Sequence, residues 1–262
     1  MEVLSGLDRS HLKIIGIGGA SPQGKGGLAI DRGLEISGKS KPNVLIIPTA
    51  KRTQEAWEKF VPATKQYFES RGLPTNLLHE RNYYHQERME ELIEDADLVY
   101  VSGGDTLHMM ETLTAYDIAP RLGRRALVGN VVLSGASAGA IMPTSWGHSD
   151  SLSYRPETST TWDYIRVNGL GLVPVAVTPH FSNRDERLGL RSSRFAEMLQ
   201  DQNDTSLGIG LDNFASYIVN NGALVPYTPY NGEHVHLLER DSSGKFTPHI
   251  MEPGETILIN ST

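Results

Sequence analysis

The chain contains no cysteine among its 262 residues. This absence excludes a disulfide scaffold, a cysteine nucleophile, and zinc or iron–sulfur sites built on thiolates. Basic residues are also in the minority, with 24 Lys and Arg against 31 Asp and Glu, so the formal net charge is -7. A chain of this charge has no basic field to attract a nucleic-acid backbone or an anionic lipid surface. We therefore expect no nucleic acid and no membrane as a partner.

Long hydrophobic runs are missing as well. No apolar stretch approaches the roughly 18 residues needed to span a bilayer. The segment Met1–Ser10 carries Glu2, Asp8 and Arg9, and it lacks the basic start and apolar stretch of a signal peptide. These features predict a cytoplasmic location.

The remaining composition is that of an ordinary globular protein, with 39% hydrophobic and 21% charged residues. The length is sufficient for one large α/β domain with a substantial core. Because we find no internal repeat, low-complexity tract or linker, we expect residues 1–262 to form a single domain.

Short apolar runs alternate with helical patterns through residues 1–140, an order typical of parallel strands joined by covering helices. The expected strands are Leu12–Gly18, Asn43–Ala50, Asn76–Glu80, Asp97–Gly103 and Leu127–Gly135. The expected helices are Thr53–Arg71, Gln86–Ala96, Thr106–Leu113 and a short one near Ala119. We therefore predict an α/β fold with a doubly wound, mostly parallel sheet and helices on both faces.

The later part of the chain continues with a strand, a helix and then a series of strand-like runs. These are a strand at Val173–Thr178, a helix at Glu186–Gln202, and strands at Leu207–Leu211, Ala215–Asn220, His234–Glu239 and Glu255–Asn260. Because the last strands follow one another without intervening helices, we expect them to form an antiparallel edge of the same domain.

A glycine-rich loop follows the first expected strand. Gly19–Gly26 comes close to the phosphate loop G-x-x-x-x-G-K-[ST], but Gly26 has no hydroxyl for Mg²⁺ and Pro22 removes one amide. The preceding Gly16 and Gly18 also fail the dinucleotide fingerprint, which needs a third glycine. We therefore expect no nucleotide or other cofactor, and interpret residues 19–27 as a tight or mobile loop beside a ligand cleft.

The strand that ends near Gly135 runs into Gly135-Ala136-Ser137-Ala138-Gly139-Ala140, a G-x-S-x-G pattern at a strand-to-helix turn. This is the context of a nucleophile elbow, in which a sharp, strained turn requires small flanking residues. The amide of Ala138 would then face an oxyanion formed beside Ser137. The alternative, in which Ser137 only caps a helix, is equally compatible with this pattern alone.

A second oxyanion donor would come from a neighbouring loop. Ser102–Thr106 ends the adjacent strand, and its glycines let a backbone N–H face the cleft. The alternative is an ordinary turn into a helix that is capped by Asp105 or Thr106.

A serine nucleophile requires a base, and His180 closes the expected strand that starts at Val173. The chain order then makes Asp150 the candidate acid that orients the histidine, with Glu157 and Asp163 as competitors. An Asx turn in a polar loop is the alternative role for Asp150. His234 and His236 alternate along a strand and are interpreted as a solvated face. We expect no metal site, since no H-E-x-x-H pattern occurs.

Together, these segments resemble one family of serine peptidases, which includes dipeptidase E and cyanophycinase and has the class I glutamine amidotransferase-like fold. The matching segments are Val101–Thr106, Gly135–Ala140, Ser149-Asp150, Leu172–Pro174, Thr178–Phe181 and Gly208–Asp212. The resemblance implies Ser137 as nucleophile, His180 as general base and Asp150 as orienting acid, with Gly104 and Ala138 as oxyanion donors. Because cyanophycinase-like members use a glutamate, it also implies Glu157 as an alternative acid.

The activity implied by the resemblance is hydrolysis of short, aspartyl-containing peptides through an acyl-enzyme. The alternatives are a cyanophycinase-like peptidase and a catalytically silent member that binds a peptide or small molecule. Four arginines, Arg184, Arg187, Arg191 and Arg194, could grip a substrate carboxylate, although a solvated helix face is the favoured interpretation. The sequence leaves a homodimer open.

Overall fold

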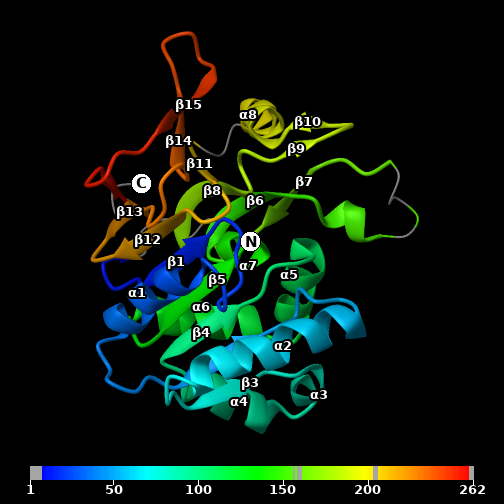
Figure 1. Cartoon of the computed structure of the whole chain (residues 1–262), viewed down its shortest axis with the longest axis vertical. Coiled ribbons are helices and arrows are strands. Elements are labelled where there is room, and N and C mark those ends of the chain that lie inside the picture. Colours follow the sequence, from blue (N-terminus) through cyan, green and yellow to red (C-terminus); the bar gives the residue numbers. More distant parts are fainter. Residues whose placement is uncertain (1–7, 156, 158–160, 203–205, 260–262) are drawn as a thin grey trace.

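The computed structural model describes residues 8–155, 157, 161–202 and 206–259. Two large sheets lie next to each other, with helices around them (Figure 1). The first sheet contains β1 (Ile14–Ile17), β2 (Val44–Ile47), β3 (Thr75–Leu77), β4 (Leu98–Val101), β5 (Val132–Ala136), β12 (Ser216–Asn220), β13 (Ala223–Tyr227) and β16 (Ile257–Leu258). Their order is β16-β13-β12-β1-β5-β4-β2-β3.

The first sheet confirms the predicted fold class. Strands β1 to β5 pair in parallel, whereas β12, β13 and β16 form an antiparallel edge next to β1. The predicted strand Leu127–Gly135 starts only at Val132, because its first residue belongs to a preceding helix of ten residues.

A second sheet was not predicted. It contains β6 (Thr144–Ser149), β7 (Ile165–Asn168), β8 (Val173–Pro179), β11 (Leu207–Leu211), β14 (Val235–Arg240) and β15 (Phe246–Ile250), in the order β15-β14-β11-β8-β6-β7. Alternation of apolar residues identified β8, β11 and β14 as strands but could not say which sheet they join. A small ribbon, β9 (Arg184–Asp185) with β10 (Gly189–Leu190), follows β8.

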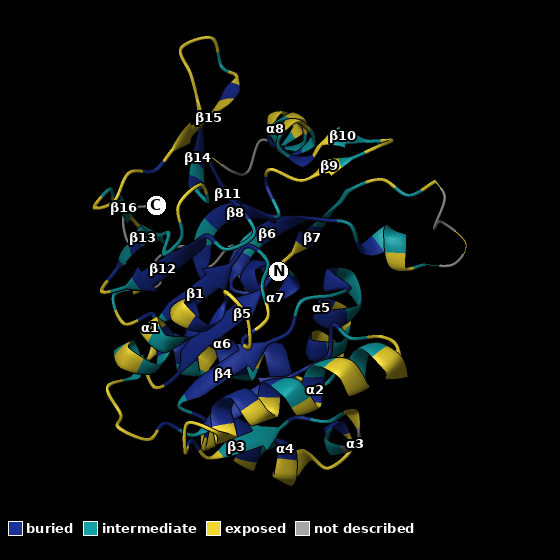
Figure 2. Ribbon diagram, in the orientation of Figure 1, coloured by how far each residue is buried: buried dark blue, intermediate teal, exposed yellow. Residues whose placement is uncertain are grey.

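Helices cover both faces of the first sheet. On one face are α1 (Gly27–Ser37) and α2 (Gln54–Glu69); on the other are α4 (Gln86–Glu94), α5 (Thr106–Ala115), α6 (Ile118–Leu127) and the short α7 (Ala138–Ile141). Strand β1 shows why two layers form, since its neighbouring residues Ile14 and Ile15 point into different cores. In Figure 2 the central strands are buried and the outer helix faces are exposed.

The remaining helical segments are α3 (Glu80–Tyr83), the 3₁₀ turn η1 (Ser151–Tyr154) and α8 (Arg191–Asp201). Helix α8 starts later than the predicted Glu186, because residues 184–190 form the β9–β10 ribbon. Phe195 and Leu199 of α8 pack with Trp146 against the second sheet. None of the helices in the described ranges is both long enough and apolar enough to cross a bilayer.

The two sheets share one core. Val175 and Val177 of β8 belong to the same buried cluster as Leu133 of β5. Between them lies α7, and the hydroxyl of Tyr217 on β12 donates a hydrogen bond of 2.8 Å to the carbonyl of Ala140. Both residues are fully buried, so this bond anchors α7 to the antiparallel edge of the first sheet.

We predict that Tyr217→Phe lowers the free energy of unfolding by about 1–2 kcal/mol, because the buried Ala140 carbonyl loses its side-chain partner. The measurement is denaturant unfolding, with Tyr227→Phe on β13 as the control, since Tyr227 is only partly buried. An equal loss in the two variants would contradict the prediction.

Candidate active site

Ser137 occupies a strained turn between β5 and α7. Its backbone has φ 54° and ψ -109°, in a region that residues with a side chain rarely adopt. The turn is so tight that a Cβ at Gly135 would lie 2.7 Å from the Cα of Gly139. The small flanking residues are therefore required by close approach, as the elbow interpretation predicts.

His180 reaches this serine from the other sheet. It follows directly after β8, also has a positive φ of 56°, and places its Nε2 3.0 Å from the Oγ of Ser137. Both residues directly follow the carboxyl end of a strand, Ser137 after β5 and His180 after β8. The structure thus brings the two residues singled out by sequence into hydrogen-bond contact.

The other imidazole nitrogen contacts Asn213, a residue that sequence reasoning missed. Oδ1 of Asn213 lies 2.6 Å from Nδ1 of His180, while its Nδ2 donates to Oδ1 of Asn183 at 3.3 Å. Because the amide nitrogen faces Asn183, the carbonyl oxygen faces the imidazole and accepts the proton on Nδ1. Nε2 is then free to accept from Ser137.

The turn that carries Asn213 is held by its neighbour Asp212. This buried carboxylate accepts hydrogen bonds from the backbone N–H of His234 at 2.9 Å, from Nε2 of His236 at 3.3 Å, and from the hydroxyl of Ser182. These bonds keep the pKa of Asp212 below its ordinary value despite its burial. His236 is therefore a structural partner rather than part of the predicted solvated face.

Asp150, the acid expected from chain order, lies against Arg191 instead of His180. Its Oδ2 is 3.2 Å from Nη1 of Arg191, whose guanidinium is only 4% exposed and also donates to the carbonyl of His148 and to Oγ1 of Thr178. A buried guanidinium requires a counter-charge, and Asp150 supplies it. The structure therefore corrects the expected contact: the residue that hydrogen-bonds to Nδ1 of His180 is Asn213, not Asp150.

The alternative acids are also elsewhere. Glu157 is exposed, and Asp163 forms an ion pair with Arg194 at 2.9 Å. The chain-order rule failed because the residue that contacts the histidine comes after it in the sequence, on the turn that follows β11.

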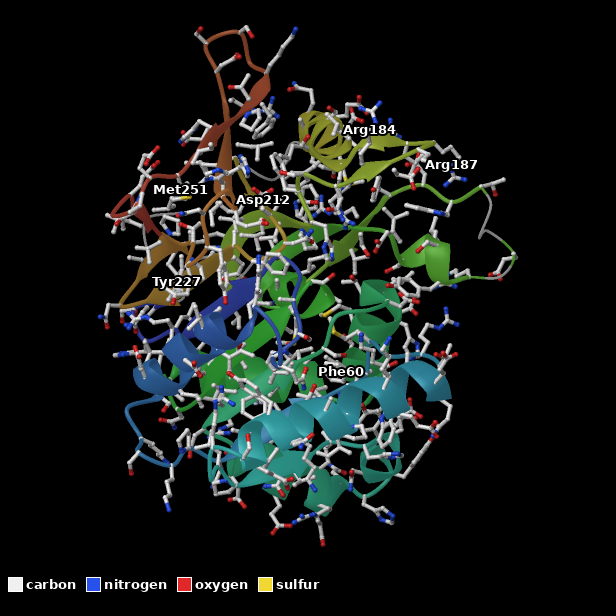
Figure 3. The ribbon with its side chains drawn as sticks, viewed as in Figure 1. Phe60, Arg184, Arg187, Asp212, Tyr227 and Met251 are labelled. Atoms are coloured by element: carbon white, nitrogen blue, oxygen red, sulfur yellow. The ribbon has the colours of Figure 1, made fainter. Side chains whose placement is uncertain are left out.

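The four arginines do not share one helix face. Arg191 is buried, and Arg194 pairs with acidic residues on the surface. Figure 3 shows Arg184 and Arg187 beside the β9–β10 ribbon, far from Phe60, which lines the serine's cavity. The expected grip on a substrate carboxylate is therefore not assembled from this set.

A cavity of about 300 Å³ opens in front of Ser137 and His180. Gly103 and Gly104 line it from the turn after β4, where a Cβ added at Gly103 would lie 3.0 Å from the Cβ of Ser137, and Ala138 follows Ser137 at the start of α7. Asp105 caps α5 by accepting from the N–H of His108 at 3.1 Å. The turn is thus capped as an ordinary helix start while its glycines still face the cavity.

The glycine-rich loop after β1 forms another wall of this cavity through Gly19, Ala20 and Ser21. Gly19 lies so close to His180 and Asn213 that an added Cβ would be 2.2 Å from Cε1 of His180 and 3.0 Å from Oδ1 of Asn213. In the described part of the chain, no three His, Asp or Glu side chains gather as a metal site requires.

Burial lowers the pKa of His180 below its ordinary value, and the nearby charge of Arg191 lowers it further. The hydrogen bond to Asn213 and the charge of Asp150 act in the opposite direction and are outweighed. The imidazole is therefore neutral at pH 7, the form that can accept a proton from a serine. The arrangement is chemically suited to nucleophilic attack by Ser137.

The family model for peptidase family S51 matches residues 13–225, which include every residue of this cavity. The chain belongs to peptidase family S51. This places the protein among peptidases, as the resemblance to dipeptidase E and cyanophycinase implied.

Individual relatives agree with the S51 assignment. A cyanophycinase from Geminocystis herdmanii is 26% identical over 201 residues, 76% of this chain and 71% of that protein. A peptidase E from Shewanella baltica is 32% identical over 97 residues, 36% of this chain and 37% of that protein. The crystal structure of a peptidase from an acI-B1 actinobacterium superposes with a TM-score of 0.72 at 21% identity, covering 95% of this chain and 98% of that one. That likeness shows the fold.

We predict that Gly19→Ala slows the reaction of Ser137 with a fluorophosphonate probe on the order of 100-fold, because the new methyl group pushes the imidazole away from the hydroxyl. The rate is followed by mass spectrometry of the adduct. Gly24→Ala in the same loop is the control, since its Cβ would meet nothing closer than 3.4 Å. Equal labelling rates for the two variants would refute the role of the close approach between Gly19 and His180.

Proposed function

We propose that this S51 protein is a serine-type peptidase that hydrolyses short peptides through an acyl-enzyme. The observation that supports the proposal is the 3.0 Å contact between Oγ of Ser137 and Nε2 of a neutral His180. The elbow geometry presents that hydroxyl to a cavity with room for roughly one amino-acid residue next to the scissile bond, given its volume of about 300 Å³.

In the proposed reaction, Ser137 attacks the peptide carbonyl while Nε2 of His180 takes its proton. The tetrahedral oxyanion lies between the backbone N–H groups of Gly104 and Ala138. His180 then protonates the leaving amine, and the acyl-enzyme forms. The same imidazole then takes a proton from a water molecule, whose oxygen attacks the ester carbonyl. As the bond from that carbon to Oγ of Ser137 breaks, the imidazolium gives the proton to Oγ and the acid is released.

Asn213 orients His180 in this reaction but carries no charge. Its carbonyl oxygen holds the Nδ1–H tautomer, which leaves Nε2 as the acceptor that attack requires. A carboxylate at this place would in addition stabilise the imidazolium that forms during attack. The neutral amide therefore gives the geometry of a triad with a weaker electrostatic contribution.

The proposed substrates are short peptides that contain aspartate, following the resemblance to dipeptidase E. The cyanophycinase relatives make cyanophycin the second substrate to assay. A silent binding protein is the competing function, because a neutral orienting residue weakens the base. Turnover of any peptide decides between catalysis and binding.

We predict that Ser137→Ala abolishes hydrolysis across a dipeptide library and removes the fluorophosphonate adduct. Ser21→Ala, which deletes another hydroxyl that lines the cavity, keeps the adduct. Hydrolysis that survives in Ser137→Ala, or an adduct on a different residue, would refute the proposal. Labelling of Ser137 without turnover of dipeptides or cyanophycin would favour the silent binding protein.

The pH dependence follows from the lowered pKa of His180. We predict that kcat/KM rises with pH on the acidic limb of its pH profile, with a midpoint below the ordinary histidine pKa of about 6.5, and that it is level at pH 7. In Asn213→Asp a negative charge stabilises the imidazolium, so the limb moves to higher pH by about one unit or more. Asn183→Asp, one residue further from the imidazole, should give a smaller shift. A limb that stays in place in Asn213→Asp would contradict the role of Asn213.

A further inference from the structure

The glycine-rich loop of residues 19–26 has a lysine near its end that contacts two aromatic rings. Lys25 is exposed, and its Nζ lies 4.5 Å from the centroid of the Phe214 ring and 5.1 Å from that of the Tyr230 ring. The two rings meet edge to face, with centroids 6.2 Å apart and planes at 74°. One ammonium therefore links this loop to two other loops of the chain.

Phe214 belongs to the turn that positions His180. Asn213 and Phe214 are the two central residues of the turn between β11 and β12. A hydrogen bond of 3.1 Å from the N–H of Ala215 to the carbonyl of Asp212 closes this turn. Because the two central residues of a turn share a planar peptide bond, a displacement of Phe214 also displaces Asn213. The carbonyl oxygen of Asn213 accepts from Nδ1 of His180, so the place of the Phe214 ring affects the orientation of the imidazole.

The other bonds of this loop are local or long. The backbone N–H of Gly24 donates to the carbonyl of Ser21 at 3.1 Å, within the loop. The side chain of Gln23 donates to Oγ1 of Thr64 at 3.5 Å, which is long for such a bond. In the part of the chain that the structure describes, no acidic side chain forms an ion pair with Lys25. The two rings are therefore the contacts that hold the end of the loop.

We propose that Lys25 is a positioning residue for the attack by Ser137. Its ammonium docks the glycine-rich loop on the two rings, which places the backbone of Gly19 against the imidazole and fixes the turn that carries Asn213. The proposal rests on the peptidase function above and goes beyond it by giving this loop a role. The lysine that a phosphate loop directs at a phosphate is directed at aromatic rings in this chain.

The contact should matter more for the reaction than for the stability of the fold. A cation–π contact at an exposed site stabilises a protein only weakly. The approach of His180 to Ser137 depends on precise placement, and a displacement of about 1 Å can slow a reaction about 100-fold. A loop that undocks part of the time therefore lowers the reaction rate while the protein stays folded.

The competing role for Lys25 is to attract anionic substrates towards the cavity. Removing such a lysine would raise KM, the effect would fade at high salt, and an uncharged probe would react as before. Removing a positioning lysine instead lowers kcat and slows the uncharged probe, with KM unchanged. A neutral fluorophosphonate therefore separates the two roles.

The experiment measures labelling of Ser137 by a neutral fluorophosphonate, together with kcat and KM for dipeptides, in wild type, Lys25→Met and Lys25→Arg. Lys25→Met should slow labelling and lower kcat about 3- to 30-fold, the factor that corresponds to the loss of one or two cation–π contacts. Lys25→Arg should retain most of the rate, because a guanidinium also stacks on aromatic rings. The control is Lys41→Met, which removes the same charge from an exposed site before β2 and should label at the wild-type rate.

A partner variant tests whether the effect passes through the turn. Phe214→Leu removes one of the two rings and should also slow labelling. In the Phe214→Leu background, Lys25→Met should have a smaller effect than in wild type, because part of its contact is already lost. Fully additive effects of the two substitutions would refute the path through Phe214.

The outcomes distinguish this proposal from the peptidase function on which it rests. If Lys25→Met labels as fast as Lys41→Met, or if its effect lies in KM alone and fades with salt, the positioning role is refuted and the peptidase function stands. Equal losses in Lys25→Arg and Lys25→Met would refute it as well. If wild type neither reacts with the probe nor hydrolyses any dipeptide, the peptidase function itself fails.

Discussion

The site depends on one contact, the 3.0 Å approach of Ser137 Oγ to His180 Nε2. Both residues have positive φ angles, 54° and 56°, so neither turn would be stable in isolation. Each follows the carboxyl end of a strand, and the two strands belong to different sheets. The shared core between the sheets, with the fully buried α7 in it, therefore holds the two strained turns at hydrogen-bond distance.

The electrostatics of the site follow from how its neighbouring charges are paired. Arg191 is almost completely buried and takes Asp150 as its counter-ion, which leaves an amide rather than a carboxylate beside His180. Asp212 carries a charge next in sequence to Asn213, but it already accepts three hydrogen bonds, from Ser182, from the backbone N–H of His234 and from His236 of β14. The imidazole of His180 is therefore positioned by hydrogen bonds and by the close backbone of Gly19, and its pKa is governed mainly by burial.

The parallel sheet and the positions of Ser137 and His180 could be predicted from the sequence, whereas the second sheet, helix α1 and the partner of His180 could not. The parallel sheet followed from apolar runs alternating with helical patterns, and Ser137 and His180 from their places after strands. The second sheet was missed because β6 and β15 contain polar residues and a proline instead of an apolar run. Helix α1 contains two glycines, and apart from Gly27, its first residue, none of its residues was assigned to an element from the sequence. Asp150 was expected beside His180 from chain order and from the family resemblance, whereas the contact with Asn213 arises from the register of β8 and β11, which the sequence does not reveal.

The neutral imidazole of His180 has its Nδ1–H held by the carbonyl oxygen of Asn213, with Nε2 left to accept from Ser137. Nitrogen-15 NMR of the labelled imidazole at pH 7 tests it most directly, because the chemical shifts of the two ring nitrogens identify the protonated one. A protonated Nδ1 and an unprotonated Nε2 are the result that the geometry predicts. A proton on Nε2, or an imidazolium with both nitrogens protonated, would contradict it.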